Sequence, residues 1–374
     1  MQTVSMLIKP ATGRCNLRCS YCFYEDVAGH RAERDMGLMS EATLERLVRT
    51  AMTSAERRVS FAFQGGEPML RGLPFFERFV QLERQYQKPG LAVEHSIQTN
   101  GTLIDEAWAG FFAKEHFLVG LSIDGTKDLH DANRLDPAGR GSWNRAVRAL
   151  ALLQKHRVET NLLCVVTGAV ARRGQAVYQS LKKLGVGYLQ FIPCLDPLGE
   201  ERGQRPFSLT PARYGQFLKD VFEVWYRDWE QGQYVSVRLF DDYVHLLTGQ
   251  PAGACATRGD CGQYYVVEGD GSVYPCDFFV LDEWRMGNLN GQDLKELAAA
   301  PAAQRFCEMG CGHPAACGGC RWLPLCGGGC RRDWVGEERN YYCEALRGFF
   351  EYAYPRMEHI AGMERRAMAD RFER

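Results

Sequence analysis

The 374-residue chain lacks the long hydrophobic runs and the charge excess that mark membrane and nucleic-acid-binding proteins. No stretch approaches the roughly 18 uninterrupted apolar residues of a membrane span. The opening residues, MQTVSMLIKPATGRCNLRC, hold no apolar run of signal-peptide length. The 45 basic and 46 acidic residues leave a net charge of −1, which excludes a global electrostatic attraction to nucleic acid or anionic membrane. The apolar content of 45% excludes general disorder.

Cysteine is the residue present in excess, with fifteen in the chain. A chain without an export signal meets a reducing compartment, where cysteines more often ligate metals or act in catalysis than form disulfides. Ten of the fifteen lie after residue 250, and this change in composition predicts a domain boundary between residues 232 and 250. We therefore expect domains over 1–232 and 233–345, followed by a C-terminal helical segment over 346–374.

Strand-like and helix-like segments alternate through the first 230 residues. Apolar runs rich in β-branched and aromatic residues predict strands at Met6–Ile8, Val59–Phe63, His95–Gln98, Phe117–Ile123, Asn161–Val166 and Tyr188–Pro193. Amphipathic stretches predict helices at Ser40–Met52, Leu73–Gln85, Asp105–Lys114, Ser142–His156 and Gly174–Leu184. This alternation is typical of a parallel sheet, open or closed into a barrel, whose ligands lie at the carboxyl ends of the strands. Functional residues are therefore expected within Cys15–Cys22, Gln64–Glu67, Thr99–Gly101, Ser122–Gly125, Thr167 and Cys194–Leu195.

The loop after the first predicted strand carries Cys15, Cys19 and Cys22 with the spacing C-x3-C-x2-C. Three thiolates at this spacing can converge on one metal centre, and soft thiolates select zinc or iron–sulfur clusters. Three ligands rather than four leave one metal position open, which a reactive centre needs. A zinc site completed by His30 is the alternative.

With Tyr21 before its last cysteine, this loop resembles the CxxxCxΦC motif of radical S-adenosylmethionine (SAM) enzymes, and Gln64–Pro68 resembles their Gly-Gly-Glu motif. The resemblance implies that the three cysteines ligate a 4Fe–4S cluster whose open iron binds SAM, and that the reduced cluster cleaves SAM to methionine and a 5′-deoxyadenosyl radical. The implied SAM contacts are Tyr21, Tyr24, Gln64, Gly65, Gly66, Glu67, Ser122, Arg134 and Leu195, with Asp124 beside Ser122. Taken alone, these positions also fit a tight turn, helix caps, a surface ion pair and core packing.

The cysteines after residue 250 resemble those of the SPASM domain, which follows the radical SAM domain in peptide- and protein-modifying members. The resemblance implies two auxiliary 4Fe–4S clusters. One would be ligated by Cys255, Cys261, Cys276 and Cys330, and the other by Cys317, Cys320, Cys326 and Cys343. Two four-cysteine zinc sites are the alternative. Of the other thiols, Cys164 and Cys194 are expected to fill the core, and Cys307 and Cys311 to be free.

Longer segments, among them SMLIKPATGRCNLRCSYCFY, SFAFQGGEP and DGSVYPCDFFVLDEWRMGN, are similar to the anaerobic sulfatase-maturating enzymes. The resemblance implies an α/β fold, with a partial (β/α)6 radical SAM barrel, a Cys-rich SPASM domain and a C-terminal helix. It implies oxidation of a Cys or Ser side chain in a C/S-x-P/A-x-R segment of a sulfatase to Cα-formylglycine. Asp277 would be the base, and an auxiliary cluster the electron acceptor.

The implied cofactors are SAM and three 4Fe–4S clusters. The implied partners are an unfolded or nascent sulfatase and an external one-electron reductant such as flavodoxin or ferredoxin. We expect a cytoplasmic monomer that binds neither nucleic acid nor membrane. Two other functions stay open. One is a radical SAM/SPASM enzyme that forms thioether or carbon–carbon crosslinks in a ribosomal peptide, and the other is a non-enzymatic iron–sulfur or zinc scaffold.

Overall fold

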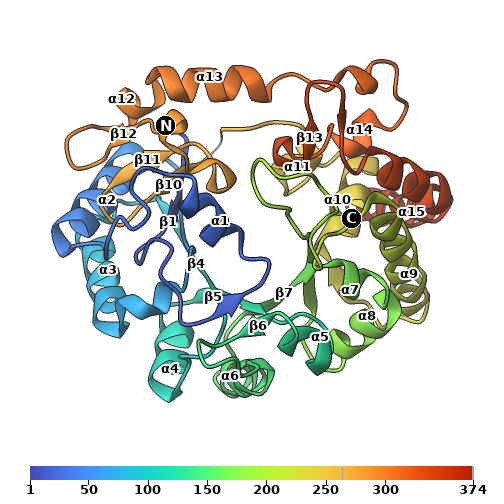
Figure 1. Cartoon of the computed structure of the whole chain (residues 1–374), viewed down its shortest axis with the longest axis horizontal. Coiled ribbons are helices and arrows are strands. Elements are labelled where there is room, and N and C mark those ends of the chain that lie inside the picture. The colour runs from blue at the N-terminus through green and yellow to red at the C-terminus, as the bar shows by residue number, and fades with distance from the viewer. Residues whose placement is uncertain (263, 373–374) are drawn as a thin grey trace.

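Ten strands pair into one sheet in the computed structural model, which describes residues 1–262 and 264–372 (Figure 1). The strand order is β12-β11-β10-β1-β3-β4-β5-β7-β8-β9. Its central strands are parallel and confirm the strands expected from the sequence: β1 (Thr3–Ile8), β3 (Arg58–Phe63), β4 (Ala92–Thr99), β5 (Phe117–Ser122), β7 (Thr160–Val166) and β8 (Tyr188–Pro193).

Helices connect these strands and surround the curved sheet on its outside, which gives the expected partial barrel (Figure 1). They are α2 (Glu41–Ser54), α3 (Leu73–Tyr86), α4 (Glu106–Lys114), α5 (Lys127–Asp131), α6 (Trp143–Lys155), α7 (Gly168–Ala171), α8 (Gly174–Lys182) and α9 (Pro211–Glu230). Helix α1 (Phe23–Gly29) instead lies in front of the middle of the barrel in Figure 1. Side chains cap the first turns of α2 and α4, since Ser40 accepts from the Thr43 amide at 3.1 Å and Asp105 accepts from the Trp108 amide at 2.9 Å.

The cysteine-rich half extends both edges of this sheet. Strand β9 (Ser236–Val237) pairs in parallel with β8, and β10 (Tyr265–Val267) pairs in parallel with β1. Strands β11 (Ser272–Tyr274) and β12 (Gly287–Asn288) continue from β10 in antiparallel order. Two small two-stranded sheets lie apart: β2 (Arg18–Cys19) with β6 (Arg134–Leu135), and β13 (Trp334–Val335) with β14 (Arg339–Asn340). Because β9 still pairs within the barrel sheet, the domain boundary expected between residues 232 and 250 stays a prediction.

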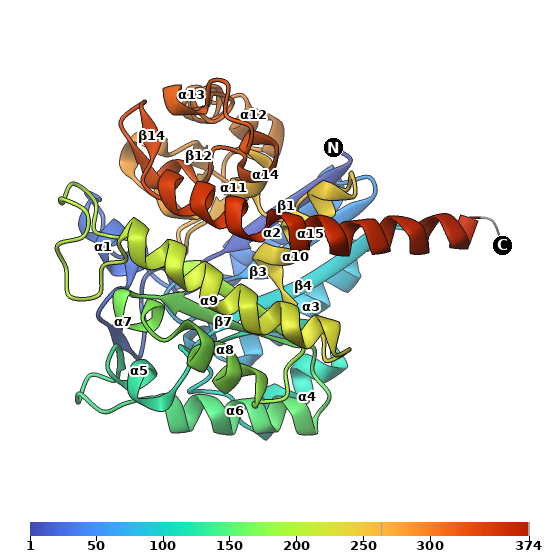
Figure 2. The ribbon, with the colours of Figure 1, turned by 90° about the vertical axis from the view of Figure 1, so that its right-hand side faces the viewer.

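The remaining helices cover the upper side of the barrel in Figure 1: α10 (Arg238–Leu247), α11 (Cys255–Arg258), α12 (Leu294–Ala298), α13 (Pro301–Gly310), α14 (Leu323–Cys326) and α15 (Cys343–Phe372). The C-terminal helix, α15, packs on α9 and α10 and then extends past the sheet (Figure 2). It begins at Cys343, three residues earlier than the segment expected from the sequence. Within the described part of the chain, no helix has both the length and the apolar character that crossing a bilayer requires.

Aromatic side chains form the core between the first strands and their helices. Phe79 of α3 is fully buried and lies edge-on to Phe61 and Phe63, with ring centroids 5.1 and 4.9 Å away, and it also contacts Phe117. Such pairs contribute beyond the area that they bury. The core therefore fixes β1 to β5, whose carboxyl ends carry the site.

We predict that Phe79→Ala lowers the free energy of unfolding by about 3–5 kcal/mol, because it removes a buried ring and leaves a cavity. Urea unfolding followed by circular dichroism measures this loss. Tyr188→Ala is the matched control, since Tyr188 is 64% exposed and its loss is expected to cost less than about 0.5 kcal/mol. Equal losses in the two variants would contradict this account of the core.

Candidate active site

The three-cysteine loop lies at the carboxyl end of β1. Cys15, Cys19 and Cys22 are half-buried. They lie close enough together that negative charge on one thiol raises the pKa of another. Burial raises the pKa of Cys15 to about 11 and that of Cys19 to about 12. Free of metal, these thiols are therefore protonated at neutral pH, and ligation of a metal must displace their protons.

A cavity of about 170 Å³, here called the barrel cavity, opens beside this loop. It is lined by all three cysteines and by Tyr21, Tyr24, Gln64, Gly65, Gly66, Ser122, Arg134 and Leu195. The structure thus brings together the expected SAM contacts except Glu67 and Asp124. Three thiols, glycine backbone and polar side chains around one cavity suit a cluster with a bound amino-acid cofactor.

Gly66 shows why this turn requires glycine. Its φ is +53°, and a Cβ there would lie 2.2 Å from the carbonyl oxygen of Arg14, directly before Cys15. The neighbouring residue, Glu67, donates its backbone amide to the same oxygen at 2.8 Å. The turn therefore packs against the cysteine loop with backbone against backbone, which any side chain at residue 66 would prevent.

The carboxylate of Glu67 points away from the barrel cavity and is fully buried. It accepts from the Thr99 hydroxyl at 2.8 Å and from the amides of Asn100 at 2.9 Å and Met69 at 3.2 Å. Burial raises its pKa to about 7. Glu67 was expected to contact SAM, but its side chain holds the turns that follow β3 and β4.

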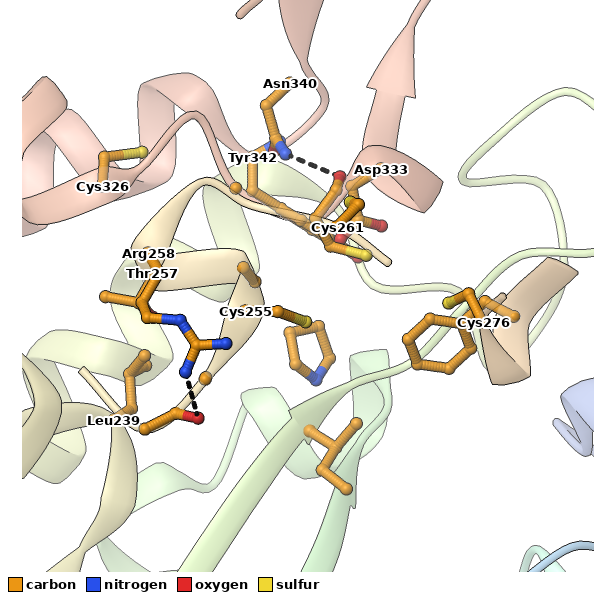
Figure 3. Close-up of a pocket in the computed structure, with 18 of the residues that line it drawn as sticks. Leu239, Cys255, Thr257, Arg258, Cys261, Cys276, Cys326, Asp333, Asn340 and Tyr342 are labelled. Carbon is orange, nitrogen blue, oxygen red and sulfur yellow. Dashed lines mark hydrogen bonds between the residues drawn. The ribbon is translucent and has the colours of Figure 1, made fainter. Parts of the chain in front are cut away.

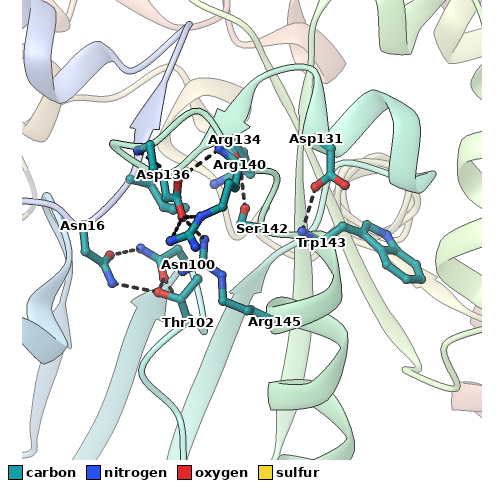
Figure 4. Close-up of polar contacts among 12 residues, drawn as sticks. Asn16, Asn100, Thr102, Asp131, Arg134, Asp136, Arg140, Ser142, Trp143 and Arg145 are labelled. Carbon is teal, nitrogen blue, oxygen red and sulfur yellow. Dashed lines mark hydrogen bonds and ion pairs between the residues drawn. The ribbon is translucent and has the colours of Figure 1, made fainter.

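Asn100 lies at the site, although no motif in the sequence predicted a role for it. Its Nδ2 donates to Asn16 Oδ1 at 2.9 Å and lies 3.7 Å from Cys15 Sγ, while its Oδ1 accepts from the hydroxyl of Thr102 at 2.6 Å (Figure 4). These contacts orient the Asn100 amide toward the cysteine loop. The one signal available was its position, since Thr99–Gly101 follows a predicted strand.

Arg134 is paired with a buried carboxylate rather than exposed. Its Nε donates to Asp124 Oδ2 at 2.8 Å, and Tyr21 donates its hydroxyl to the same oxygen. Burial opposes ionisation of Asp124, but the adjacent guanidinium outweighs it and holds the pKa of that carboxyl below its usual range. Asp124 therefore positions Arg134 at the cavity wall, where Arg134 was expected to bind SAM, and the alternative of a surface ion pair does not hold.

The first auxiliary set, Cys255, Cys261, Cys276 and Cys330, is gathered around a second cavity of about 460 Å³, here called the cysteine cavity (Figure 3). Cys255 lies close enough to each of the other three cysteines to raise the pKa of its thiol. Burial raises the pKa of Cys261 to about 11 and that of Cys276 to about 12. Cys326, expected in the other set, also lines this cavity, so the division of the cysteines between two clusters stays a prediction.

The second auxiliary set is Cys317, Cys320, Cys326 and Cys343. Cys326 has the other three as electrostatic neighbours, and burial raises its pKa to about 11. Within the described residues, no three of the His, Cys, Asp and Glu side chains lie close enough to hold one metal ion. A four-iron cluster binds each thiolate through its own iron, so its ligands stand farther apart than those of a single ion.

The remaining thiols divide into two pairs. Cys164 and Cys194 are buried in the core, as expected. Cys307 and Cys311 lie next to each other at the end of α13, and Cys307 also neighbours Cys261. That these two are free thiols stays a prediction.

Asp277 follows Cys276, which lines the cysteine cavity, and it is hydrogen-bonded to two residues that line the barrel cavity. It is 4% exposed, and its Oδ2 accepts from the Tyr24 hydroxyl at 2.7 Å and from Gln64 Nε2 at 3.2 Å. Burial raises its pKa. A buried carboxylate behind two cavity-lining groups is in the position of a general base.

Comparison with known proteins shows to which family the chain belongs. Models of the Radical SAM superfamily and of the iron–sulfur cluster-binding SPASM domain match residues 10–175 and 260–321. The cysteine-type anaerobic sulfatase-maturating enzyme of Clostridium perfringens (strain 13 / Type A) is 44% identical over 366 residues, which cover 96% of this chain and 99% of that protein. The chain belongs to the family of anaerobic sulfatase-maturating enzymes. It is a radical SAM enzyme, and both domains imply SAM and 4Fe–4S clusters as its cofactors.

Other members and solved structures agree. The serine-type enzyme of Klebsiella aerogenes is 32% identical over 348 residues, with coverage of 92% of this chain and 84% of that protein. The structure of anSMEcpe with bound AdoMet and Cp18Cys peptide is 44% identical, with a TM-score of 0.92 and coverage of 96% and 99%. Streptococcus suis SuiB bound to precursor peptide SuiA shares the fold, at 16% identity, a TM-score of 0.64 and coverage of 91% and 75%. The expected fold class is confirmed.

We predict that Gly66→Ala impairs loading of the cluster at the three-cysteine loop, because the added methyl group would displace Arg14 and with it Cys15. Iron analysis after anaerobic reconstitution should show a loss of about four of about twelve irons per chain. Gly139→Ala is the control, since Gly139 also has a positive φ but no atom within 4 Å of its added methyl group. Full iron content in Gly66→Ala would show that the close approach is dispensable.

Proposed function

We propose that this chain oxidises a cysteine side chain in a C-x-P/A-x-R segment of a sulfatase polypeptide to Cα-formylglycine. The observation that carries the proposal is Asp277, a buried carboxylate bound by Tyr24 and Gln64, two residues that line the barrel cavity. The identity of 44% to a cysteine-type enzyme, against 32% to a serine-type one, favours cysteine as the substrate residue. The substrate peptide in the 44% identical structure supports a peptide as the partner.

SAM and the cluster that binds it supply, when bound and reduced, a 5′-deoxyadenosyl radical able to take a hydrogen atom from the substrate Cβ. Cys15, Cys19 and Cys22 would ligate this cluster. The backbone of Gly65 and Gly66 leaves room for the amino-acid part of SAM beside it. Ser122, Arg134 and Leu195, at the ends of β5, β6 and β8, would hold the remaining parts of the cofactor.

Asp277 would take the proton of the substrate thiol. Because burial raises the pKa of its carboxyl, Asp277 is a stronger base than an exposed aspartate. The Tyr24 hydroxyl and the Gln64 amide hold Oδ2 and so fix the direction of the carboxylate. Loss of one hydrogen atom, one proton and one electron converts the cysteine to a thioaldehyde, and water then replaces sulfur to give the aldehyde.

The electron that the substrate loses would pass to an auxiliary cluster. Cys255, Cys261, Cys276 and Cys330 would hold an auxiliary cluster whose chemistry there is one-electron transfer. Cys317, Cys320, Cys326 and Cys343 would hold the second. We further propose that an external reductant such as flavodoxin or ferredoxin supplies electrons, and that the enzyme acts as a cytoplasmic monomer on unfolded or nascent sulfatase.

The deciding experiment is anaerobic incubation of the reconstituted enzyme with SAM, a reductant and a synthetic peptide containing Cys-x-Pro-x-Arg. Mass spectrometry should show conversion of the cysteine to formylglycine together with 5′-deoxyadenosine. The same peptide with serine measures the preference between the two residues. Cleavage of SAM with an unchanged peptide would overturn the proposal and favour the crosslinking of a ribosomal peptide.

We predict that Asp277→Asn lowers formylglycine formation by about 10²–10⁴-fold, the usual contribution of general acid–base catalysis, while SAM is still cleaved. The amide keeps the size of the carboxylate but accepts no proton. Product and 5′-deoxyadenosine are measured in the same reaction. Asp282→Asn, on the next short helix, is the control and should retain activity. Undiminished product from Asp277→Asn would exclude Asp277 as the base.

A further inference from the structure

A buried ion pair joins the barrel to the cysteine-rich domain directly below Asp277. Parallel pairing of β1 with β10 places Ile8 opposite Val267, so that the next residues, Lys9 and Glu268, emerge side by side. Lys9 Nζ lies 2.7 Å from Glu268 Oε1, and the two side chains are 3% and 0% exposed. The register of the sheet therefore builds this pair.

Arg31 adds a second cation to the same carboxylate. Its Nη1 lies 2.9 Å from Glu268 Oε1, and its side chain is 1% exposed. Burying such charges is costly unless they are paired. Glu268 is paired with both Lys9 and Arg31, so its single negative charge does not balance the two positive charges. A further carboxylate beside Lys9 can balance the charge that remains.

Asp277 is that carboxylate. Lys9 Nζ is 3.9 Å from Asp277 Oδ1, which is buried and has no hydrogen-bond partner among residues 1–262 and 264–372. The other oxygen, Oδ2, is held by Tyr24 and Gln64. Lys9 Nζ also lies over the ring of Tyr24, 5.0 Å from its centroid. One ammonium thus faces both the carboxylate and the phenol that binds it.

The path of the Lys9 side chain is fixed as well. A Cβ on Gly65, whose φ is +90°, would lie 2.6 Å from Lys9 Cε and 2.7 Å from Lys9 Cγ. The glycine turn therefore leaves space for the Lys9 chain to pass beneath it. The four charged groups, two cations and two carboxylates, form a balanced set that is closed off from solvent.

We propose that Lys9, anchored by Glu268, is a positioning residue that holds Asp277 Oδ1 while Tyr24 and Gln64 hold Oδ2. The inference rests on the proposed function, because Lys9 would hold Asp277, the proposed base, in position. Its consequence is that Lys9 determines how efficiently SAM cleavage is coupled to product formation. The Lys9 ammonium contacts Glu268, Asp277 and Tyr24 and is not expected to touch the substrate.

The test measures the ratio of 5′-deoxyadenosine to formylglycine in the reconstituted enzyme with the Cys-x-Pro-x-Arg peptide. Lys9→Met, which keeps the length of the side chain and removes its charge, should raise this ratio at least about tenfold and lower kcat more than it raises KM. Lys9→Arg restores a cation and should recover most of the coupling. Lys155→Met removes an exposed lysine that pairs with Glu106 and should leave the ratio unchanged.

If Lys9 only stabilised the fold, its substitution would leave the ratio of 5′-deoxyadenosine to formylglycine unchanged. Loss of folded enzyme lowers 5′-deoxyadenosine and formylglycine together and leaves their ratio constant. The double variant Lys9→Met/Glu268→Gln removes one charge of each sign, which keeps the buried set balanced, and it should still be uncoupled. A wild-type ratio in the folded, iron-replete double variant would overturn the inference. Absence of formylglycine from the wild-type enzyme would instead overturn the proposed function.

Discussion

The carboxylate of Glu67 is the interaction on which the rest of the site depends. It satisfies three buried donors from the turns after β3 and β4, while its own backbone amide binds the loop that carries Cys15. Each donor left without an acceptor would cost about 1–3 kcal/mol. Three loops that are far apart in sequence thus meet at one buried residue, Glu67. The cysteine loop, the glycine turn and Asn100 can therefore move only together, which suits a site that must hold a reactive cofactor in one geometry.

The second constraint is the addition of β10 to the edge of the barrel at β1. This pairing sets the position of β11, and Asp277 follows the end of β11 by three residues. Asp277, the proposed base, and the barrel cavity therefore come from different parts of the chain that share one sheet. A slip of the β1–β10 register by one residue would separate Lys9 from Glu268 and turn the side chains of β10 to the opposite face. The hydrogen bond from the Lys9 amide to the Val267 carbonyl, at 2.8 Å, holds that register.

The sequence predicted the strands and the helices because each has a local signature, whereas the two auxiliary cysteine sets came from the resemblance to the SPASM domain. Strands such as β3 and β8 are short segments rich in apolar and aromatic residues. Side-chain direction has no such signature. Glu67 belongs to a recognised motif, yet its carboxylate is buried and accepts from Met69, Thr99 and Asn100. Lys9 and Glu268 are 259 positions apart and meet only through strand pairing, so no pattern in the chain could join them.

The two auxiliary cysteine sets interleave along the chain, since Cys330 of the first set lies between Cys326 and Cys343 of the second. Neither set can close unless the segment 317–343 has already folded back across the cysteine cavity. This segment has few buried apolar side chains, among them Trp322 and Leu325. Its order therefore depends on ligation more than on a core of its own. The barrel, with its aromatic core, does not share this dependence, so loss of the clusters should loosen the cysteine-rich domain first.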